Sequence, residues 1–183
     1  ATCAQAQAGI AACATVATHL FNGMRQLNHR EPGVVGAAIA AGLFCELIND
    51  GVHVNPVVAR LVENLVLVTD AMEAAGSCDG DYLLGGQHVV VSGGVARVRE
   101  TGSLAGSTAT MASLVRRTVQ ESGLSLPAVA EAASGRPAAL LGIADRFGAL
   151  APGRMADLVV PDDDLEILGV LIAGGWSTPI CPI

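Results

Sequence analysis

Three short apolar segments, each ending in a polar group, constrain the fold of this chain more than any other feature. The segments are residues 14–17, 43–48 and 65–68, and the polar groups that follow them are His19, Asp50 with His53, and Asp70. A stretch long enough for a helix separates each segment from the next. This rhythm is typical of βα repeats, in which parallel strands turn their carboxyl ends towards one shared site. The sequence therefore predicts an α/β fold with a parallel sheet.

The rest of the chain predicts further helices and a group of hairpin strands. Helices are predicted for residues 2–13, 34–41, 55–63, 108–122, 125–133 and 136–141. Ser107 or Thr108 can cap the fourth of these helices, and Gly123 can end it. Gly-rich turns separate predicted strands at 82–84, 88–91 and 95–98, and residues 148–176 return to β character with an acidic, solvated turn at 162–164.

Composition excludes several classes of function. The net charge is −7 and all ten basic residues are Arg, so no basic stripe for nucleic acid and no Schiff-base lysine are expected. No apolar run approaches the roughly 18 residues of a membrane span. The five cysteines have no CxxC pair and are expected to be reduced. Residues 1–10 lack the features of a signal peptide, and a cytoplasmic location is expected.

The densest group of potential catalytic side chains lies in residues 18–33. His19 can be a metal ligand or a hydrogen-bonded core histidine. Arg30 offers a planar fork suited to a phosphate, or it can form a surface ion pair with Glu31. Asp70, outside this stretch, follows a predicted buried strand and can cap a following helix.

Six motifs in register carry a resemblance to a known family. They are THLFNGM, NHREPG, DGVHV, LVTDAMEAAG, GSLAGST and GALAPGRMADLVV. In this order and at these spacings they resemble the C-terminal half of the N-acetylglucosamine-6-phosphate deacetylase family, within the amidohydrolase superfamily. The resemblance covers nearly the whole chain to residue 176.

The resemblance implies a (β/α)8 barrel of the TIM type flanked by a small β-sandwich. For this chain it implies only the last three barrel strands and part of the sandwich. The implied ranges are a barrel segment at 1–80, a β-hairpin element at 81–100, a barrel-closing loop and helices at 101–147, and sandwich strands at 148–183. A homodimer is also implied.

The resemblance also implies a reaction and a set of site residues. The reaction is hydrolysis of the acetamide of N-acetylglucosamine 6-phosphate to glucosamine 6-phosphate and acetate, with a divalent metal, zinc, that lowers the pKa of bound water and polarises the carbonyl. His19 is the implied metal ligand, and Asp70 is the implied general base and acid. The implied substrate-binding residues are Asn22, Gly23, Arg30, Asp50, Gly51, Val52, His53, Leu104, Ala105 and Gly106.

The sequence departs from the family in two ways. The family's other metal ligands, a Glu and a His, fall before Ala1, and one His cannot hold a catalytic zinc that takes three protein ligands. We therefore expect neither tight zinc nor turnover from these 183 residues alone. Gly23 stands where the family commonly has Ala, which keeps the main-chain donor but loosens the loop by roughly 0.5–1 kcal/mol.

Two alternatives to this function stay open. One is an amidohydrolase that acts on another N-acetylated sugar. The other is a non-catalytic fragment that dimerises or pairs with an N-terminal half, because exposed edges of a partial barrel favour association.

Overall fold

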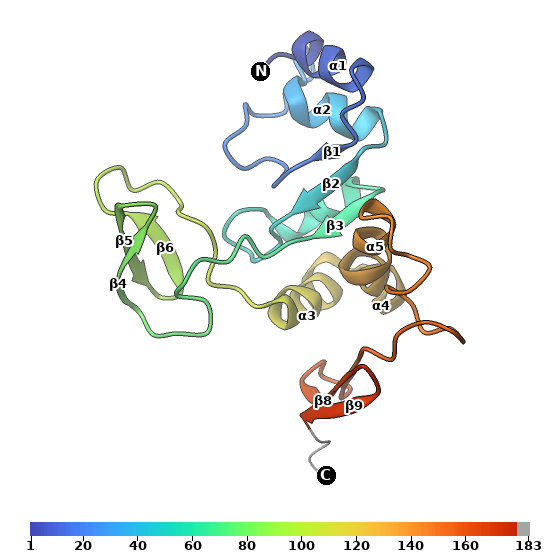
Figure 1. The fold of residues 1–183 in the computed structure, drawn as a ribbon. Coiled ribbons are helices and arrows are strands. Elements are labelled where there is room, and N and C mark those ends of the chain that lie inside the picture. Colours follow the sequence, from blue (N-terminus) through green and yellow to red (C-terminus); the bar gives the residue numbers. More distant parts are fainter. Residues whose placement is uncertain (179–183) are drawn as a thin grey trace.

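The computed structural model describes residues 1–178, and the three apolar segments form one parallel sheet (Figure 1). Its strands are β1 (Val16–Ala17), β2 (Phe44–Leu47) and β3 (Leu65–Leu67), in the order β1-β2-β3. Cys45 in the central strand pairs with Ala17 on one side and with Leu65 on the other. The predicted parallel sheet is therefore confirmed. The expectations for Cys181 and the last residues of the 148–183 range fall outside the described residues.

The two crossovers of this sheet are helical, but the second is a 3-10 helix. α2 (Gly33–Ala40) joins β1 to β2, and η1 (Pro56–Leu61) joins β2 to β3. Asn55 caps η1 by accepting a hydrogen bond from the Val57 N–H at 3.0 Å. The prediction that this helix runs to residue 63 is wrong, because Val62 is already extended (φ −105°, ψ 104°) and leads the chain into β3. So short a crossover suits the tighter 3-10 geometry.

The first helix, α1 (Cys3–Ala11), packs against α2. Thr2 caps it, since its side chain accepts from the Gln5 N–H while the Gln5 side chain accepts from the Thr2 N–H. In Figure 1, α2 lies next to β1 with α1 beyond it, and the later helices lie next to β3. Within residues 1–178 no helix has the length and apolar character needed to cross a membrane.

The main hydrophobic core lies between the parallel sheet and its helices. Its largest fully buried side chains include Leu20, Leu47 and Leu67, which are 1%, 0% and 2% exposed. Val35 of α2 packs into the same cluster, as does Val129 from a later helix. Burying one such side chain stabilises the fold by about 1.5–3 kcal/mol, so this cluster supports the strands that lead to the site.

The helix α3 (Met111–Ser122) forms where it was predicted, but a different residue caps it. Thr110 accepts a hydrogen bond from the Ser113 N–H at 3.2 Å, whereas Ser107 and Thr108 lie in the preceding loop. The predicted Ser107 and Thr108 caps are wrong because both hydroxyls bond elsewhere: Ser107 Oγ accepts from the Ala109 N–H, and Thr108 Oγ1 donates to the Gly94 carbonyl. The prediction that Gly123 ends the helix is confirmed, since its φ is +68°.

The two helices predicted after α3 form one helical run without a loop. Its parts are α4 (Leu126–Ala130), the π-helical η2 (Glu131–Gly135) and α5 (Arg136–Leu140). Pro137 explains the π-helical part, because a proline donates no hydrogen bond and its ring clashes with the carbonyl four residues earlier. The wider π turn accommodates that clash, so the break expected from the sequence is a change of helix type.

A small antiparallel sheet projects to one side of the parallel sheet (Figure 1). Its strands are β4 (Gly80–Leu84), β5 (Gln87–Ser92) and β6 (Val95–Val98), as predicted. It has a core of its own, formed by the buried residues Met72, Ala74, Val89, Val91, Ala96 and Ala105. Two of these precede β4 and one follows β6, so the chain on both sides of the sheet is fixed to it.

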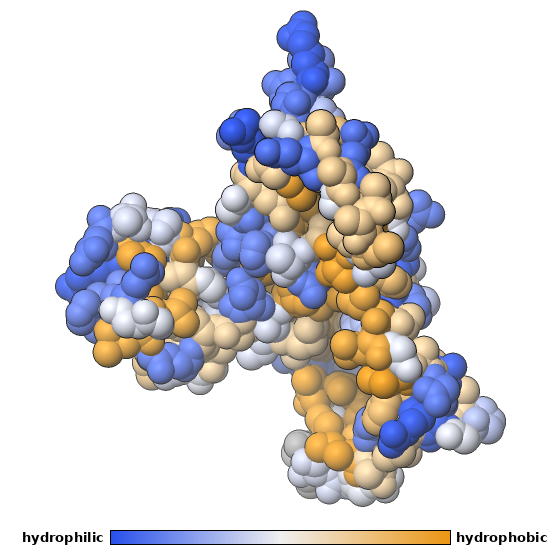
Figure 2. Space-filling model, turned by 45° about the horizontal axis from the view of Figure 1, so that its top comes forward, coloured by the Kyte–Doolittle hydropathy of each residue, from blue (hydrophilic) through white to orange (hydrophobic). Residues whose placement is uncertain are grey.

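A second antiparallel sheet carries the C-terminal strands. They are β7 (Leu158–Pro161), β8 (Ile167–Ile172) and β9 (Gly175–Thr178). Asp162 forms the predicted turn between β7 and β8, because its Oδ1 accepts from the N–H groups of Asp164 (3.0 Å) and Glu166 (2.8 Å). Figure 2 shows hydrophobic surface on the lobe that carries this sheet, where Val159 is 58% exposed.

Candidate functional site

The polar residues that follow the three parallel strands lie at one edge of the sheet. Thr18, directly after β1, donates from Oγ1 to Oε2 of Glu46 on β2 at 2.7 Å. The Leu20 N–H donates to the Glu46 carbonyl at 2.7 Å, and the Val68 N–H donates to the Leu47 carbonyl at 3.2 Å. These bonds join the residues after β1 and β3 to β2 itself, as expected of parallel strands whose carboxyl ends lie at one edge of a sheet.

His19 and Asp70, at the ends of the two outer strands, both have a strained backbone. Their φ angles are +33° and +49°, in the left-handed region that residues other than glycine rarely adopt. Such strain amounts to about 1–3 kcal/mol per residue and concentrates at functional sites. Nδ1 of His19 is buried and has no hydrogen-bond partner, so the alternative of a hydrogen-bonded core histidine finds no support at that atom.

Asp70 presents an exposed side chain at the end of β3. The chain after it enters turns and then β4, so the alternative in which Asp70 caps a helix is wrong. The loop before α3 lies against its main chain, because the Ser107 N–H donates to the Asp70 carbonyl at 2.8 Å. At Gly106, φ is +68° and a Cβ would lie 2.9 Å from that carbonyl, so only glycine allows this approach.

Two other residues of this loop, Leu104 and Ala105, contact the small antiparallel sheet. Leu104 forms an isolated bridge with Arg97 of β6, and Ala105 is 5% exposed in the core of the small sheet. The Ala105 side chain is therefore turned away from solvent, and its contribution to a ligand site is limited to main-chain atoms.

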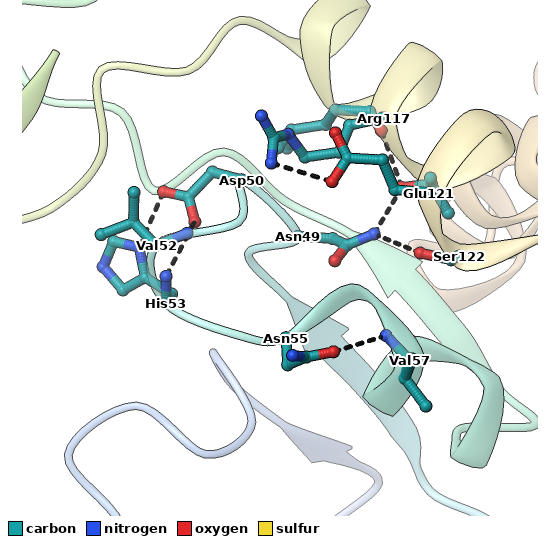
Figure 3. A network of polar contacts seen from close by, with 11 residues as sticks. Asn49, Asp50, Val52, His53, Asn55, Val57, Arg117, Glu121 and Ser122 are labelled. Atoms are coloured by element: carbon teal, nitrogen blue, oxygen red, sulfur yellow. Dashed lines mark hydrogen bonds and ion pairs between the residues drawn. The ribbon is translucent and has the colours of Figure 1, made fainter.

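Asp50 and His53 form a buried pair in the turn after β2 (Figure 3). Their side chains are 10% and 2% exposed, and His53 Nδ1 lies 2.8 Å from Asp50 Oδ2. Since an ionised carboxylate only accepts, Nδ1 carries the proton. Asp50 Oδ1 accepts from the N–H groups of Val52 and His53, both at 2.9 Å. Nε2 of His53 is buried without a partner and is left to meet another polar group.

The charge of Asp50 is stabilised by this turn. Burial raises the pKa of its carboxyl group, but the hydrogen bond from the His53 side chain, those from the His53 and Val52 N–H groups and the charge of His53 together outweigh burial. The pKa therefore lies below its ordinary value. Gly51, with φ at +79°, and Val52, 41% exposed, form the outer part of the turn.

The loop that holds Asn22, Gly23 and Arg30 begins directly after His19. The Asn22 N–H donates to the His19 carbonyl at 2.9 Å, which starts the loop as a turn. Gly23 has φ at +65° with open space around it, and Arg30 is exposed. Within residues 1–178 no hydrogen bond or ion pair joins the Arg30 side chain to Asp50, His53 or Asp70.

The alternative ion pair between Arg30 and Glu31 is wrong. Glu31 Oε1 accepts instead from the N–H groups of Cys3 at 2.7 Å and Gly33 at 3.3 Å. The guanidinium of Arg30 therefore stays available to a ligand, while Glu31 ties the start of α1 to the start of α2.

The described residues do not complete a metal site. Across residues 1–178, no group of at least three His, Cys, Asp or Glu side chains is placed to hold a metal ion. A catalytic zinc takes three protein ligands, and His19, with its orphaned ring nitrogen, offers one. No catalytic step through a metal can therefore be derived from these residues.

Two shallow hollows are found on the surface of the described residues. One, of about 320 Å³, lies where α3 meets the small sheet and is lined by residues that include Asp79, Gly94 and Thr110. The other, of about 400 Å³, is lined by Glu73, Asp81, Tyr82, Leu83 and His88. Neither lining includes His19, Asp50, His53 or Asp70.

Asn49 and Arg117 lie at the site and were missed by the sequence analysis. Asn49 is fully buried beside Asp50, and its Nδ2 donates to the hydroxyl oxygens of Thr118 and Ser122 on α3. Arg117 lies against the Gly51 backbone. A signal existed for Asn49, because a buried apolar segment rarely ends in an amide unless a partner satisfies it.

The fold and the site together define a class of protein. Residues 1–176 match the Amidohydrolase family, so the chain belongs to the amidohydrolase family. The fold of this family is of the TIM-barrel type, and the chain contains part of it as mixed sheets and helices.

The relatives of the chain are amino-sugar phosphate deacetylases. It is 42% identical over 180 residues to N-acetylglucosamine-6-phosphate deacetylase of Bos taurus, across 92% of this chain and 44% of that protein. It is 41% identical over 180 residues to N-acetylgalactosamine-6-phosphate deacetylase of Escherichia coli O157:H7, across 95% of this chain and 48% of that protein.

A solved structure gives the same result. A variant of N-acetyl-D-glucosamine-6-phosphate deacetylase from Mycobacterium smegmatis, in complex with N-acetyl-D-glucosamine-6-phosphate, superposes with a TM-score of 0.92 at 43% identity. The match covers 97% of this chain and 49% of that one. The chain thus spans about half the length of the relatives it matches.

Proposed function

We propose that the strand-end site takes part in hydrolysing the acetamide of N-acetylglucosamine 6-phosphate, giving glucosamine 6-phosphate and acetate, in the whole enzyme. The observation that carries this proposal is the position of Asp70. Its exposed carboxyl lies at the sheet edge where His19 and the Asp50–His53 pair also follow their strands, and the Ser107 N–H donates to its main-chain carbonyl. The relatives named above act on substrates of this class.

The proposal assigns the parallel sheet to the last three strands of a (β/α)8 barrel. Along the chain, we assign residues 1–80 to the barrel segment, 81–100 to a β-hairpin element, 101–147 to the barrel-closing loop and helices, and 148–183 to a small β-sandwich. The parallel order β1-β2-β3 and the separate antiparallel sheets support this division. The strand edges of an open barrel and the pattern of the family favour a homodimer.

His19 is the proposed ligand of a divalent metal, zinc in the simplest case. Enzymes of the amidohydrolase superfamily typically depend on such a metal. When bound, it would make hydroxide available at neutral pH. The buried, unpartnered Nδ1 shows that the His19 ring lies in a partly closed environment. The remaining ligands must come from outside the described residues.

Asp70 is the proposed general base and acid. Its exposed carboxylate can accept a proton from the attacking water and pass it to the leaving amine, because an amine leaves poorly unless it is protonated. Arg30, with the N–H groups of Asn22 and Gly23, is proposed to bind the phosphate, since a guanidinium matches phosphate geometry with two parallel hydrogen bonds.

The turn after β2 and the loop before α3 are proposed to bind the sugar. The residues are Asp50, Gly51, Val52, His53, Leu104, Ala105 and Gly106. The unpartnered Nε2 of His53 supports this role, because a ligand hydroxyl would satisfy it.

The test of this substrate class is the affinity of the Arg30→Ala variant. We expect it to bind N-acetylglucosamine 6-phosphate at least tenfold more weakly while its affinity for N-acetylglucosamine is unchanged, because a hydrogen bond to a charged group contributes about 1.5–3 kcal/mol. Arg60→Ala, an exposed arginine elsewhere, is the matched control. Equal affinities of the Arg30→Ala variant and the wild type for the phosphorylated sugar would exclude this assignment.

N-acetylgalactosamine 6-phosphate is a second candidate substrate. The chain is 41% identical to the deacetylase of that sugar phosphate and 42% identical to the deacetylase of N-acetylglucosamine 6-phosphate, so sequence identity does not separate the two epimers. Competition between the two epimers in one assay decides between them.

The non-catalytic alternative is tested by adding zinc to two preparations. One is the chain alone, and the other is the chain mixed with the N-terminal half of the Mycobacterium smegmatis relative, called here the complemented enzyme. Acetate release by neither preparation would favour the non-catalytic alternative.

A cytoplasmic location is proposed on chemical grounds. Four cysteines of the described chain are free, and Cys13 and Cys78 among them are exposed, which suits a reducing compartment. Alkylation of the protein inside intact cells by a membrane-permeant thiol reagent, compared with an impermeant one, tests this location.

A further inference from the structure

The turn that holds the Asp50–His53 pair packs against one helix, α3. The residue before Asp50 and the residue after it both contact α3 (Figure 3). We propose that Asn49 and Arg117 are positioning residues that set the geometry of this turn, an inference that rests on the sugar-binding role proposed above.

Asn49 is the buried half of this attachment. It is 0% exposed, and its Nδ2 donates to Thr118 Oγ1 at 2.9 Å and to Ser122 Oγ at 3.0 Å. Thr118 Oγ1 in turn donates to the Leu114 carbonyl at 2.7 Å, so its lone pairs face Asn49. A buried amide whose Oδ1 has no partner is costly compared with an apolar side chain of similar size. The two hydrogen bonds of Asn49 therefore fix the distance between the end of β2 and α3, which an apolar contact would leave less defined.

Arg117 is the exposed half. Its guanidinium lies over Gly51, where a Cβ would come within 2.0 Å of Nη1 and 2.9 Å of Cζ. Oε2 of Glu121, one helical turn further on, lies 3.1 Å from Nη1 of Arg117, and this ion pair keeps the guanidinium in place. The absence of a side chain at position 51 thus lets α3 contact the turn directly.

The same helix also connects the turn to Asp70. α3 begins directly after the loop in which Ser107 bonds to the main chain of Asp70 and Met72, at 2.8 and 2.9 Å. The rigid helix therefore spans from the loop beside Asp70 to the turn that holds Asp50 and His53. Loss of the Asn49 contact would therefore shift the sugar-binding turn relative to α3 and weaken substrate binding, which gives this connection a functional effect.

The test compares Asn49→Leu with Asn64→Ala. Asn64 donates a similar hydrogen bond to the Gly42 carbonyl, 2.8 Å away, at the opposite end of the sheet. In the complemented enzyme we expect Asn49→Leu to raise KM about tenfold with kcat within twofold, and Asn64→Ala to leave both unchanged. Thr118→Val should reproduce the KM effect, and Thr118→Ser, which keeps the hydroxyl, should restore wild-type KM.

A second measurement does not depend on activity. The Nδ1 proton of His53 is observed by NMR in the free chain, and we expect its exchange with water to become at least tenfold faster in Asn49→Leu and unchanged in Asn64→Ala. Arg117→Ala should also make this exchange faster, because it removes the guanidinium that lies over Gly51.

The outcomes separate the two proposals. Unchanged proton exchange in Asn49→Leu, or equal changes in Asn49→Leu and Asn64→Ala, overturns the positioning role. A fall in melting temperature with KM and proton exchange unchanged would also overturn it, because that is the effect of a purely structural contact. If the complemented enzyme releases no acetate, the proposed function fails, and the NMR measurement still decides the positioning role.

Discussion

The parallel sheet β1-β2-β3 and the antiparallel sheet β7-β8-β9 each have three strands, yet they bury their residues to opposite extents. All residues of β3 are 2–3% exposed, whereas Val159, Ile172 and Trp176 of the second sheet are 58%, 59% and 51% exposed. Only the first sheet is part of a described hydrophobic cluster. The candidate site is attached to the sheet that has its own core, which fixes the strand ends that carry it. Left-handed backbone alone does not distinguish the two sheets, since Leu165 and Ala173 beside β8 also have positive φ angles.

The strongest test of this comparison is the exchange of one carboxyl in each region for an amide. Asp70→Asn should lower kcat of the complemented enzyme by about 10²–10⁴-fold with little change in KM, because it removes the proton acceptor. Asp163→Asn, in the exposed turn between β7 and β8, should leave kcat unchanged. Steady-state acetate release measures both, and similar losses in the two variants would contradict the assignment.

The next largest effect concerns stability. Leu47→Ala should lower the free energy of unfolding by about 2–5 kcal/mol, because Leu47 is 0% exposed and the truncation leaves a cavity. Ile172→Ala, a truncation of the same size in β8, should change it by less than about 0.5 kcal/mol. Urea unfolding followed by circular dichroism gives both values. Equal losses would show that the second sheet contributes as much to the cooperative core as the first.

The pH dependence of stability provides a third, smaller effect. The pKa of Asp50 is lower in the folded chain than in the unfolded chain, where it is about 3.8. The ionised carboxylate therefore stabilises the fold at pH values above the unfolded pKa, and this stabilisation is lost as pH falls towards the folded pKa. Asp50→Asn should therefore flatten the fall in unfolding free energy between about pH 5 and pH 3. Ile172→Ala should keep the wild-type slope. A wild-type slope in Asp50→Asn would contradict the role given to its hydrogen bonds.

The smallest expected effect is local. Asp162→Ala removes the two hydrogen bonds that close the turn between β7 and β8, so amides of these strands should exchange roughly fivefold faster, which is about 1 kcal/mol. Amides of β2 and β3 should keep their rates. Native-state hydrogen exchange resolves the two sheets, and equal acceleration in both would show that they open as one unit.

The sequence predicted the features that repeat along the chain. Alternating apolar segments and crossovers were enough to predict the parallel sheet, because such segments have few other ways to bury themselves. The helix cap was missed because Ser107, Thr108 and Thr110 are chemically similar, and the choice depends on which hydroxyls the neighbouring turn and loop use. Likewise, Pro137 signals a disturbed helix, but not that a π turn will absorb it.

The contacts within the site were harder to predict. Asn49 and Thr118 are 69 positions apart, and nothing local to either residue names the other as a partner. The lowered pKa of Asp50 depends on a turn whose geometry is set by this distant helix. The positions of His19, Asp50 and Asp70 at strand ends were predictable, whereas the supporting contacts behind them required the fold.

The left-handed backbone at His19 and Asp70 has a consequence for engineering this chain. Glycine would relieve the strain at either position, so a library selected by melting temperature alone would enrich glycine at both. Each such gain would delete a proposed metal ligand or proton acceptor. Thermostabilisation should therefore hold positions 19 and 70 constant and draw its diversity from the exposed strands β7 and β8.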